Sequence, residues 1–399
     1  MPAFRVMDLF CGTGGFSKGF ENEGHFEVVF GIDLLRVAIE TFRLNHPKAL
    51  GVAGDIRSVQ PPKVSQWLNV RRGDIDVIIG GPPCQGFSSI RPHRSANTED
   101  SRNYLFQEFA DYVAYFRPRV FVLENVVGLA TYGNGDTLDR MQDVFEHFGY
   151  SVDWRIVNAA HFGIPQKRER LIMLGAESGI NLSFPDPTHE CHSDTIGIRE
   201  KKRMLLPRQR TLFDFDTPVL PPAITVTDAI GDLPCLESGQ TAHEYTISPQ
   251  TEYQHERRAR CMTLTLHAST AHTPKMLEII RHSGSNISSI PRHLITSGFS
   301  SCYSRLTANE PSVTITVNFV HPASNRCIHP TQDRALTPRE GARLQGFDDI
   351  FTFAGSRTEI VKQIGNAVPP LLGQSIASHV ADLLGAGTKL SLSPVYCSC

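Results

Sequence analysis

The sequence predicts an α/β protein with a doubly wound, mostly parallel sheet and a smaller, irregular domain inserted into it. Three observations support this prediction. Short, almost wholly apolar segments alternate with amphipathic ones through residue 176, which is typical of parallel strands covered by helices on both faces. Residues 178–340 are instead rich in Ser, Thr, Pro and His, with few long apolar periods. Helical character then returns after Thr337.

Six segments have the composition of strands, because each is short and rich in β-branched or aromatic residues. They are Phe4–Phe10, Glu27–Ile32, Asp76–Ile79, Val120–Glu124, Val152–Asn158 and Leu171–Ala176. Apolar residues at helical spacing predict helices between these strands and near the end of the chain. They are Phe16–Glu23, Val37–Asn45, Tyr104–Phe116, Thr137–Phe148 and Pro369–Leu384, the last beginning with proline. We therefore divide the chain into residues 1–185, an inserted domain over 186–339, and a return to the first domain over 340–399.

The composition excludes several classes of protein. With 40% hydrophobic and 20% charged residues in a chain of 399, a sizeable core can form and disorder is not expected. Lys and Arg number 39 against 41 Asp and Glu, which excludes a globally basic coat protein for nucleic acid but leaves room for a local basic face. Nine dispersed cysteines without a zinc-type CxxC pair predict a reduced, cytosolic protein. No apolar run suits a bilayer span or a signal peptide, so we expect no membrane association.

A glycine cluster in the segment Asp8–Phe16 lies directly between the first predicted strand and the first predicted helix. Glycines at this place permit a tight turn and a close approach of the backbone to a cofactor. Asp8, Asp33 and Asp55 each lie at or just beyond a strand end, where Asp33 suits ribose hydroxyls and Asp55 an adenine amine. Ser17 stands where the dinucleotide fingerprint requires its third glycine. The pattern favours a nucleotide-like cofactor, and an ordinary tight turn is the alternative.

A second loop, Gly80–Ser88, reads GGPPCQGFS and follows the predicted strand at 76–79. Two glycines and two prolines fix a turn that neither a helix nor a strand could accommodate. Cys84 therefore lies at the carboxyl end of a central strand, where open α/β sheets place their ligands. A small buried hydrophobe is the alternative role of a free cysteine. The rigid polar turn favours a nucleophilic thiol, which needs nearby positive charge or a helix end to ionise.

The loop around Cys84 resembles the catalytic loop of the cytosine-C5 DNA methyltransferase family, and the family's other motifs occur in the same order. They are DLFCGTGGFS at 8–17, which resembles the S-adenosylmethionine loop, LENV at 123–126, QKRER at 166–170, RLTANEPSVTIT from Arg305, and GNAVPP at 365–370. The resemblance covers residues 4–176 and about 305–384. Cys11 and Asp33 depart from the usual pattern, where many members carry another small residue and Glu. Neither departure removes a required chemical group.

The resemblance implies a Rossmann-like fold and an S-adenosylmethionine-dependent DNA (cytosine-5-)-methyltransferase. Residues 1–185 and 340–399 would form the catalytic domain, the latter with its closing helix and a tail, and residues 186–339 the target-recognition domain. S-adenosyl-L-methionine is the implied cofactor. Its implied binding residues are Phe10, Gly12, Gly14, Gly15, Asp33, Asp55, Ile56, Pro83, Leu105, Asn366 and Ala367.

The implied chemistry can be built from four side chains. Addition of the Cys84 thiolate to C6 of cytosine breaks the aromaticity of the ring and makes C5 nucleophilic toward a methyl sulfonium. Glu124, at a predicted strand end, is the acid expected near N3, and a loop-ordering carboxylate is the alternative. Arg168 and Arg170 alternate along a strand and so face the same side. The resemblance makes them supports for cytosine O2 and for the site geometry, and a surface ion pair is the alternative. We also expect base flipping, because the target base lies inside a duplex.

Candidate DNA contacts fall in two segments. Residues 88–103 are polar and without periodicity, as a mobile loop closing over phosphates would be. Between Glu278 and Glu310 there are several Arg and His but no acidic residue, which suits phosphates or bases; a solvated face is the alternative. The candidates are Gln85, Ser88, Arg91, Arg94, Arg281, Arg292 and Arg305. The segment 188–192 matches no structural zinc pattern, so no metal site is expected.

The short chain favours a prokaryotic or phage modification enzyme that acts as a monomer on double-stranded DNA. We expect it in the cytoplasm, associated with the nucleoid through DNA. A restriction-modification system would add a cognate endonuclease that forms no stable complex with it. Two alternatives stay open. One is a tRNA cytosine-5 methyltransferase on the same scaffold. The other is a nicotinamide-dependent oxidoreductase, which the glycine loop suggests but Ser17 and the proline–cysteine loop argue against.

Overall fold

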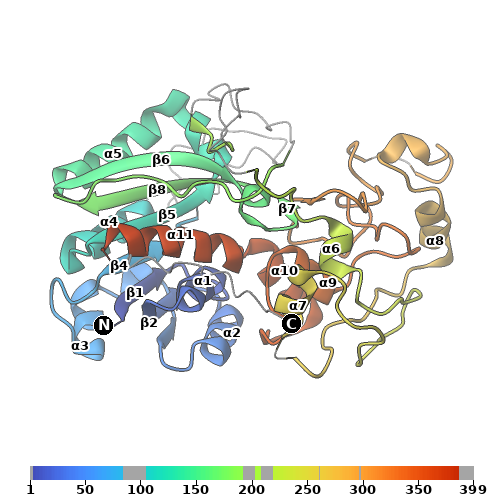
Figure 1. The fold of residues 1–399 in the computed structure, drawn as a ribbon, viewed down its shortest axis with the longest axis horizontal. Helices are drawn as coiled ribbons and strands as arrows, with labels where there is room; N and C mark the ends of the chain where they lie inside the picture. Colours follow the sequence, from blue (N-terminus) through green and yellow to red (C-terminus); the bar gives the residue numbers. More distant parts are fainter. Residues whose placement is uncertain are drawn as a thin grey trace, which may run out of the picture.

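The computed structural model describes residues 3–83, 105–191, 203–207, 219–259, 261–295 and 298–385. Within them, a seven-stranded sheet has the order β3-β2-β1-β4-β5-β8-β6 (Figure 1). Its strands are β1 Phe4–Leu9, β2 Phe26–Asp33, β3 Leu50–Ala53, β4 Val77–Gly80, β5 Val120–Val126, β6 Tyr150–Asn158 and β8 Glu169–Glu177. β8 runs antiparallel to β5 and β6, and the remaining pairs are parallel. The predicted doubly wound, mostly parallel sheet is confirmed.

Helices cover both faces of this sheet. One layer contains α1 Gly15–Glu23, α2 Arg36–Asn45 and α11 Pro370–Leu383, and the other contains α3 Pro61–Leu68, α4 Leu105–Phe116 and α5 Asp136–His147. Side chains of a strand alternate between the two layers. Val120 and Val122 pack in the first, whereas Phe121 and Leu123 pack in the second. Because all four are fully buried, each contributes roughly 1.5–3 kcal/mol of hydrophobic stabilisation.

The six predicted strands and five predicted helices are all present, with ends that differ by a few residues. Within the seven-stranded sheet and its two helix layers, only β3 and α3 were not predicted from the sequence. β3 has only four residues and lies at the edge of the sheet, where half of its side chains are exposed. α3 begins with two prolines, which made the segment resemble a loop, although proline is well tolerated in a first helical turn.

The C-terminal helix α11 returns to the first domain and crosses α1 at close range (Figure 1). A Cβ atom placed on Gly19 would lie 2.5 Å from the carbonyl carbon of Gly373 and 2.4 Å from the carbonyl oxygen of Pro370. Glycine at position 19 is therefore what lets the two helices touch. The crossing anchors α11 beside the loop that follows β1.

A second core brings together the short helices α6 Val226–Ile230, α7 Glu252–Arg258, α9 Pro338–Leu344 and α10 Arg357–Asn366. The same cluster contains Leu233 and Phe319, which precede residue 340, and Phe347 and Ile364, which follow it. Packing is thus continuous across the predicted 339/340 boundary. The side chains of α11 pack in the core of the first domain. A separate small cluster of Ile279, Ile290 and Leu294 supports α8 Pro274–Arg281.

Buried ion pairs hold the second core together. Arg343 pairs with Asp232 at 2.5 Å and with Asp349 at 2.7 Å, and all three side chains are inaccessible to solvent. Arg334 pairs with Glu340 at 2.6 Å, and Glu340 also closes the capping box of α9. Removing one partner from such a pair costs about 3–5 kcal/mol, since a buried charge is left without compensation. In the part of the chain that the structure describes, no helix is long and apolar enough to cross a membrane.

Candidate active site

A cavity of about 720 Å³ opens at the carboxyl ends of the central strands. A smaller cavity of about 320 Å³ adjoins it. The two share six lining residues: Phe10, Gly12, Leu35, Gly81, Glu124 and Asn366. They therefore form one continuous site at the place where open α/β sheets bind their ligands.

Most of the predicted cofactor residues line the larger cavity. They are Phe10, Gly12, Asp33, Asp55, Ile56, Pro83, Leu105 and Asn366. Ala367 lines the smaller cavity. Gly14 and Gly15 are not among the lining residues of either cavity.

Gly14 and Gly15 instead let the glycine loop pack closely against the neighbouring segments. Gly14 has φ +83° at the N-cap of α1, and a Cβ atom there would lie 2.4 Å from Nε2 of His46. A Cβ atom on Gly15 would lie 2.5 Å from the carbonyl oxygen of Val368. These two glycines therefore allow close packing that fixes the cavity wall, and only glycine fits both places.

Two backbone amides hold the carboxylate of Asp33. Gly12 N donates to Oδ2 at 2.9 Å, and Leu35 N donates to Oδ1 at 2.8 Å. Burial raises the pKa of Asp33, although the backbone hydrogen bonds oppose this rise. The contact with Gly12 joins the end of β2 to the glycine loop. The Asp33 carboxylate thus holds together two segments that line the cavity.

Asp55 caps the short 3-10 helix Ile56–Ser58 by accepting a hydrogen bond from Arg57 N at 3.0 Å. The Arg57 guanidinium also lies 2.5 Å from Oδ2 of Asp55. These hydrogen bonds lower the pKa of Asp55, which keeps the side chain an acceptor on the cavity rim.

Glu124, which lines both cavities, forms an ion pair with Arg170, which lines the larger one. Nε of Arg170 lies 2.8 Å from Oε1 of Glu124, and the two side chains are only 16% and 13% exposed. Burial lowers the pKa of Arg170, and the Glu124 carboxylate opposes this effect. Next to Glu124, Asn125 Nδ2 donates to the carbonyl oxygen of Pro82 at 3.0 Å. This bond ties the proline turn to the end of β5.

Arg168 also lines the larger cavity, but its guanidinium is bonded to backbone carbonyls. It donates to Ile315 O at 3.3 Å, Gly365 O at 3.3 Å and Ala367 O at 3.1 Å. Burial lowers the pKa of Arg168, and the charge of Arg170 adds to this effect. Arg168 therefore fixes the position of the Gly365–Ala367 segment, whereas Arg170 orients a carboxylate.

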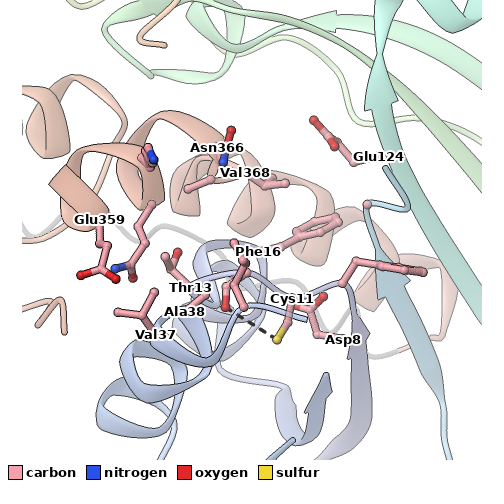
Figure 2. Close-up of a pocket in the computed structure, with 17 residues that line it drawn as sticks. Asp8, Cys11, Thr13, Phe16, Val37, Ala38, Glu124, Glu359, Asn366 and Val368 are labelled. Carbon is pink, nitrogen blue, oxygen red and sulfur yellow. Dashed lines mark hydrogen bonds between the residues drawn. The ribbon is translucent and has the colours of Figure 1, made fainter. Parts of the chain in front are cut away.

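The smaller cavity lies between the loop after β1, the start of α2 and one face of α10 (Figure 2). Asp8 lies at its base, where Ser17 Oγ donates to Oδ2 of Asp8 at 2.6 Å. Burial raises the pKa of Asp8 to about 7; Asp33 adds to the rise and Ser17 opposes it. Thr13 also lines this cavity, and its buried hydroxyl has no hydrogen-bond partner among the described residues. Asp8 was expected at a strand end, but neither Asp8 nor Thr13 was among the predicted site residues.

The DNA-contact candidates are separated by the structure. Arg281 and Arg292 are exposed on the lobe around α8. Arg305 is partly buried: its guanidinium donates to the carbonyl oxygens of His329, Gln332 and Ile280 and pairs with Asp333 at 2.8 Å, and its contact with DNA stays a prediction. Cys84 and the candidates Gln85, Ser88, Arg91 and Arg94 lie outside the described residues. Among the residues described, no group of three or more side chains could hold a metal ion.

The fold and the site together define an α/β enzyme of the Rossmann-like methyltransferase class, with a nucleotide-sized cavity at the carboxyl edge of its sheet. The chain matches the model of C-5 cytosine-specific DNA methylase over residues 4–382. It therefore belongs to the C-5 cytosine-specific DNA methylase family, and it is a DNA (cytosine-5-)-methyltransferase.

Individual relatives agree with this assignment. The Type II methyltransferase M.AgeI of Thalassovita gelatinovora is 32% identical over 94% of this chain and 99% of its own length. The Type II methyltransferase M1.HphI of Haemophilus parahaemolyticus is 33% identical over 94% of this chain and 86% of its own length. A solved structure described as a DNA modification methyltransferase encoded within an E. coli prophage matches with a TM-score of 0.72 and 25% identity. The match covers 96% of this chain and 100% of that one.

Proposed function

We propose that this enzyme methylates C5 of a cytosine that is flipped out of a specific duplex sequence, through a covalent bond to Cys84. The position of Pro83 carries this proposal. Pro83 lines the larger cavity together with Glu124 and Arg170, and Cys84 is the next residue in the chain. Because Cys84 directly follows Pro83 in the chain, we assign its thiol as the nucleophile of this cavity.

The chain's own residues account for activation of the base. The Cys84 thiolate forms a bond to C6 of cytosine, and the displaced electron pair makes C5 nucleophilic while negative charge develops at N3. Glu124 stabilises N3 by sharing a proton with it, and Arg170 holds the Glu124 carboxylate in place. After methyl transfer a base removes the C5 proton, the C6–S bond breaks, and the electron pair returns to the thiolate.

S-adenosyl-L-methionine fits the donor set of the two cavities. When bound, it supplies an electrophilic methyl group on its sulfonium. Asp33 and Asp55 offer carboxylate acceptors to ribose hydroxyls and to an adenine amine in the larger cavity. The smaller cavity would take the methionyl end, where Asp8 and Glu359 offer carboxyl groups and Lys362 offers positive charge. Gly81 and Glu124 line both cavities and would contact the cofactor between its two ends.

Double-stranded DNA would bind with Arg281 and Arg292 of the α8 lobe at its phosphates or bases, and with Gln85, Ser88, Arg91 and Arg94 around the flipped base. The names of the Type II relatives support a role as the modification enzyme of a prokaryotic restriction-modification system. We propose that the protein acts as a monomer in the cytoplasm, on the nucleoid, and that any cognate endonuclease acts without forming a stable complex with it.

Bisulfite sequencing of DNA from a methylation-free host that expresses this chain would test the proposal. We expect 5-methylcytosine at one position of one short sequence. Methylation of tRNA with no change in DNA would instead support an RNA methyltransferase on the same scaffold. Absence of methyl transfer to either nucleic acid, in protein that binds S-adenosylmethionine, would overturn the proposal.

A further inference from the structure

A pair of buried glutamines links the catalytic sheet to the second core. Gln166 lies on the short strand β7 Gln166–Lys167, and Gln345 is the C-cap residue of α9. Both side chains are fully buried, and Gln166 Nε2 donates to Gln345 Oε1. Gln166 Nε2 also donates to Leu344 O at 3.2 Å, and Gln166 Oε1 accepts a hydrogen bond from Ile315 N at 2.8 Å.

The side-chain amide nitrogen of Gln345 contacts the backbone segment that forms part of the cavity wall. Gln345 Nε2 donates to the carbonyl oxygen of Ala367 at 2.6 Å. Arg168 donates to the same oxygen and to that of Gly365. The carbonyls on both sides of Asn366 are therefore held by buried donors. Asn366 lines both cavities, and Ala367 lines the smaller one.

The hydrogen-bond network joins the seven-stranded sheet to the second core. Gln166 and Arg168 belong to the turn that enters β8, whereas Gln345 follows a helix of the second core. A buried polar network with its partners in place holds one rigid arrangement, since any displacement leaves a donor or acceptor unpaired at low dielectric. The position of Asn366 thus depends on a side chain that the second core supplies.

We propose that Gln345 is a positioning residue for cofactor binding, which sets the Asn366–Ala367 wall through its hydrogen bond to Ala367 O. This inference rests on the proposed use of S-adenosylmethionine in these cavities. Gln345 itself does not line either cavity among the residues described. Its effect on the reaction therefore passes through the backbone that carries Asn366.

The substitution Gln345→Met keeps the length of the side chain and removes both hydrogen bonds. We expect the Kd and the KM for S-adenosylmethionine to rise roughly five- to tenfold, the scale of one lost hydrogen bond in a buried network. The kcat at saturating cofactor should stay within about twofold, because no group that touches the reacting atoms is changed. Calorimetry and steady-state kinetics measure the two effects separately.

Gln254→Met is the matched control. Gln254 is also buried, donates to Thr227 O at 3.2 Å and accepts from Gln250 N at 2.7 Å, but it lies on α7 and lines neither cavity. It should lower the thermal unfolding midpoint as Gln345→Met does, with unchanged cofactor affinity. Equal losses of affinity in the two variants would show only a general loss of stability and would overturn the proposal.

Gln166→Met provides a second route to the same test if Gln345→Met does not fold. It should weaken cofactor binding in the same direction, and the double variant should lose less than the sum of the two single losses. Strict additivity, or wild-type affinity in either folded variant, would overturn the proposal. Failure of the wild-type protein to bind S-adenosylmethionine would instead refute the proposed function on which the inference rests.

Discussion

Nε of Arg170 lies 2.8 Å from Oε1 of Glu124, although 46 residues separate the two positions in the chain. The pair forms because β5 and β8 are adjacent and antiparallel, with Val126 opposite Arg170. A carboxylate near the end of one strand thus receives a guanidinium from the start of the other. Since both line the larger cavity, the pair fixes the direction in which Glu124 faces a ligand.

Arg170→Lys should lower kcat by roughly ten- to a hundredfold, the scale of a misplaced catalytic group. A flexible ammonium cannot reproduce the planar contact between Arg170 and Glu124. Affinity for S-adenosylmethionine should change little. Lys167→Ala is a control from the same motif, because Lys167 forms a largely solvent-facing ion pair with Glu310 at 2.8 Å. The idea fails if the two variants have the same kcat.

Asp8→Asn should change how stability depends on pH. The folded-state pKa of Asp8 is about 7, whereas an unfolded aspartate titrates near about 3.9. Its contribution to stability is present below the unfolded pKa and is lost as the pH rises toward the folded pKa. The variant should therefore gain stability relative to wild type between about pH 4 and 7, by up to about 1.4 kcal/mol per pH unit, and gain no more above that range.

Urea unfolding of cofactor-free protein at several pH values measures this effect. Ser17→Ala is the companion variant, because it removes the hydroxyl that donates to Asp8 and should lower stability further at neutral pH. A stability difference between Asp8→Asn and wild type that is the same at every pH would show that Asp8 does not take up the proton.

Asp33→Ala should weaken S-adenosylmethionine binding by roughly 1.5–3 kcal/mol, the scale of a lost hydrogen bond to a charged group. The substitution also leaves Gly12 N and Leu35 N without the carboxylate oxygens that accept their hydrogen bonds in the wild type. Asp76→Ala is a suitable control, since Asp76 also accepts a backbone hydrogen bond, from Arg5 N at 2.9 Å, and lines neither cavity. Calorimetry that finds equal affinity in the Asp33 variant and wild type would remove Asp33 from the site.

Much of the fold could be predicted from the sequence, because apolar periodicity reports directly which residues face a core. The glycine loop and the acids after each strand predicted where a cofactor cavity would form. Long-range packing could not be predicted in this way. Arg305 occurs in an acid-free stretch, and no local pattern shows that its guanidinium bonds to three backbone carbonyls and pairs with Asp333. The role of Gln345 depends on Ala367, and no local pattern connects the two.

Arg292→Ala and Arg281→Ala should each weaken DNA binding without changing cofactor affinity. A phosphate contact would weaken binding uniformly and reduce the salt slope by about 1, whereas a base contact would relax preference at one base pair. Arg305→Ala should differ from both by lowering the free energy of unfolding, since three backbone carbonyls lose their donor. Fluorescence anisotropy at several salt concentrations separates these cases. Wild-type DNA affinity in both exposed-arginine variants would show that the α8 lobe is only a solvated face.

A duplex whose target cytosine carries fluorine at C5 tests the covalent step. The Cys84 thiolate should add to C6 and the methyl group should be transferred, but C5 then carries no proton that a base can remove. Elimination of the thiolate stalls, so a denaturation-resistant complex should accumulate only when S-adenosylmethionine is present. Peptide mapping should place the bond at Cys84.

Cys84→Ser should form no such complex, because a hydroxyl is far harder to ionise than a thiol. Arg170→Lys is informative in the same assay, since it keeps the thiol while disturbing Glu124. It should form the complex more slowly and to the same final amount. An adduct at another cysteine, or full turnover by the serine variant, would contradict nucleophilic catalysis by Cys84. An adduct that formed equally fast in Arg170→Lys would show that the Glu124–Arg170 pair does not act before the carbon–sulfur bond is made.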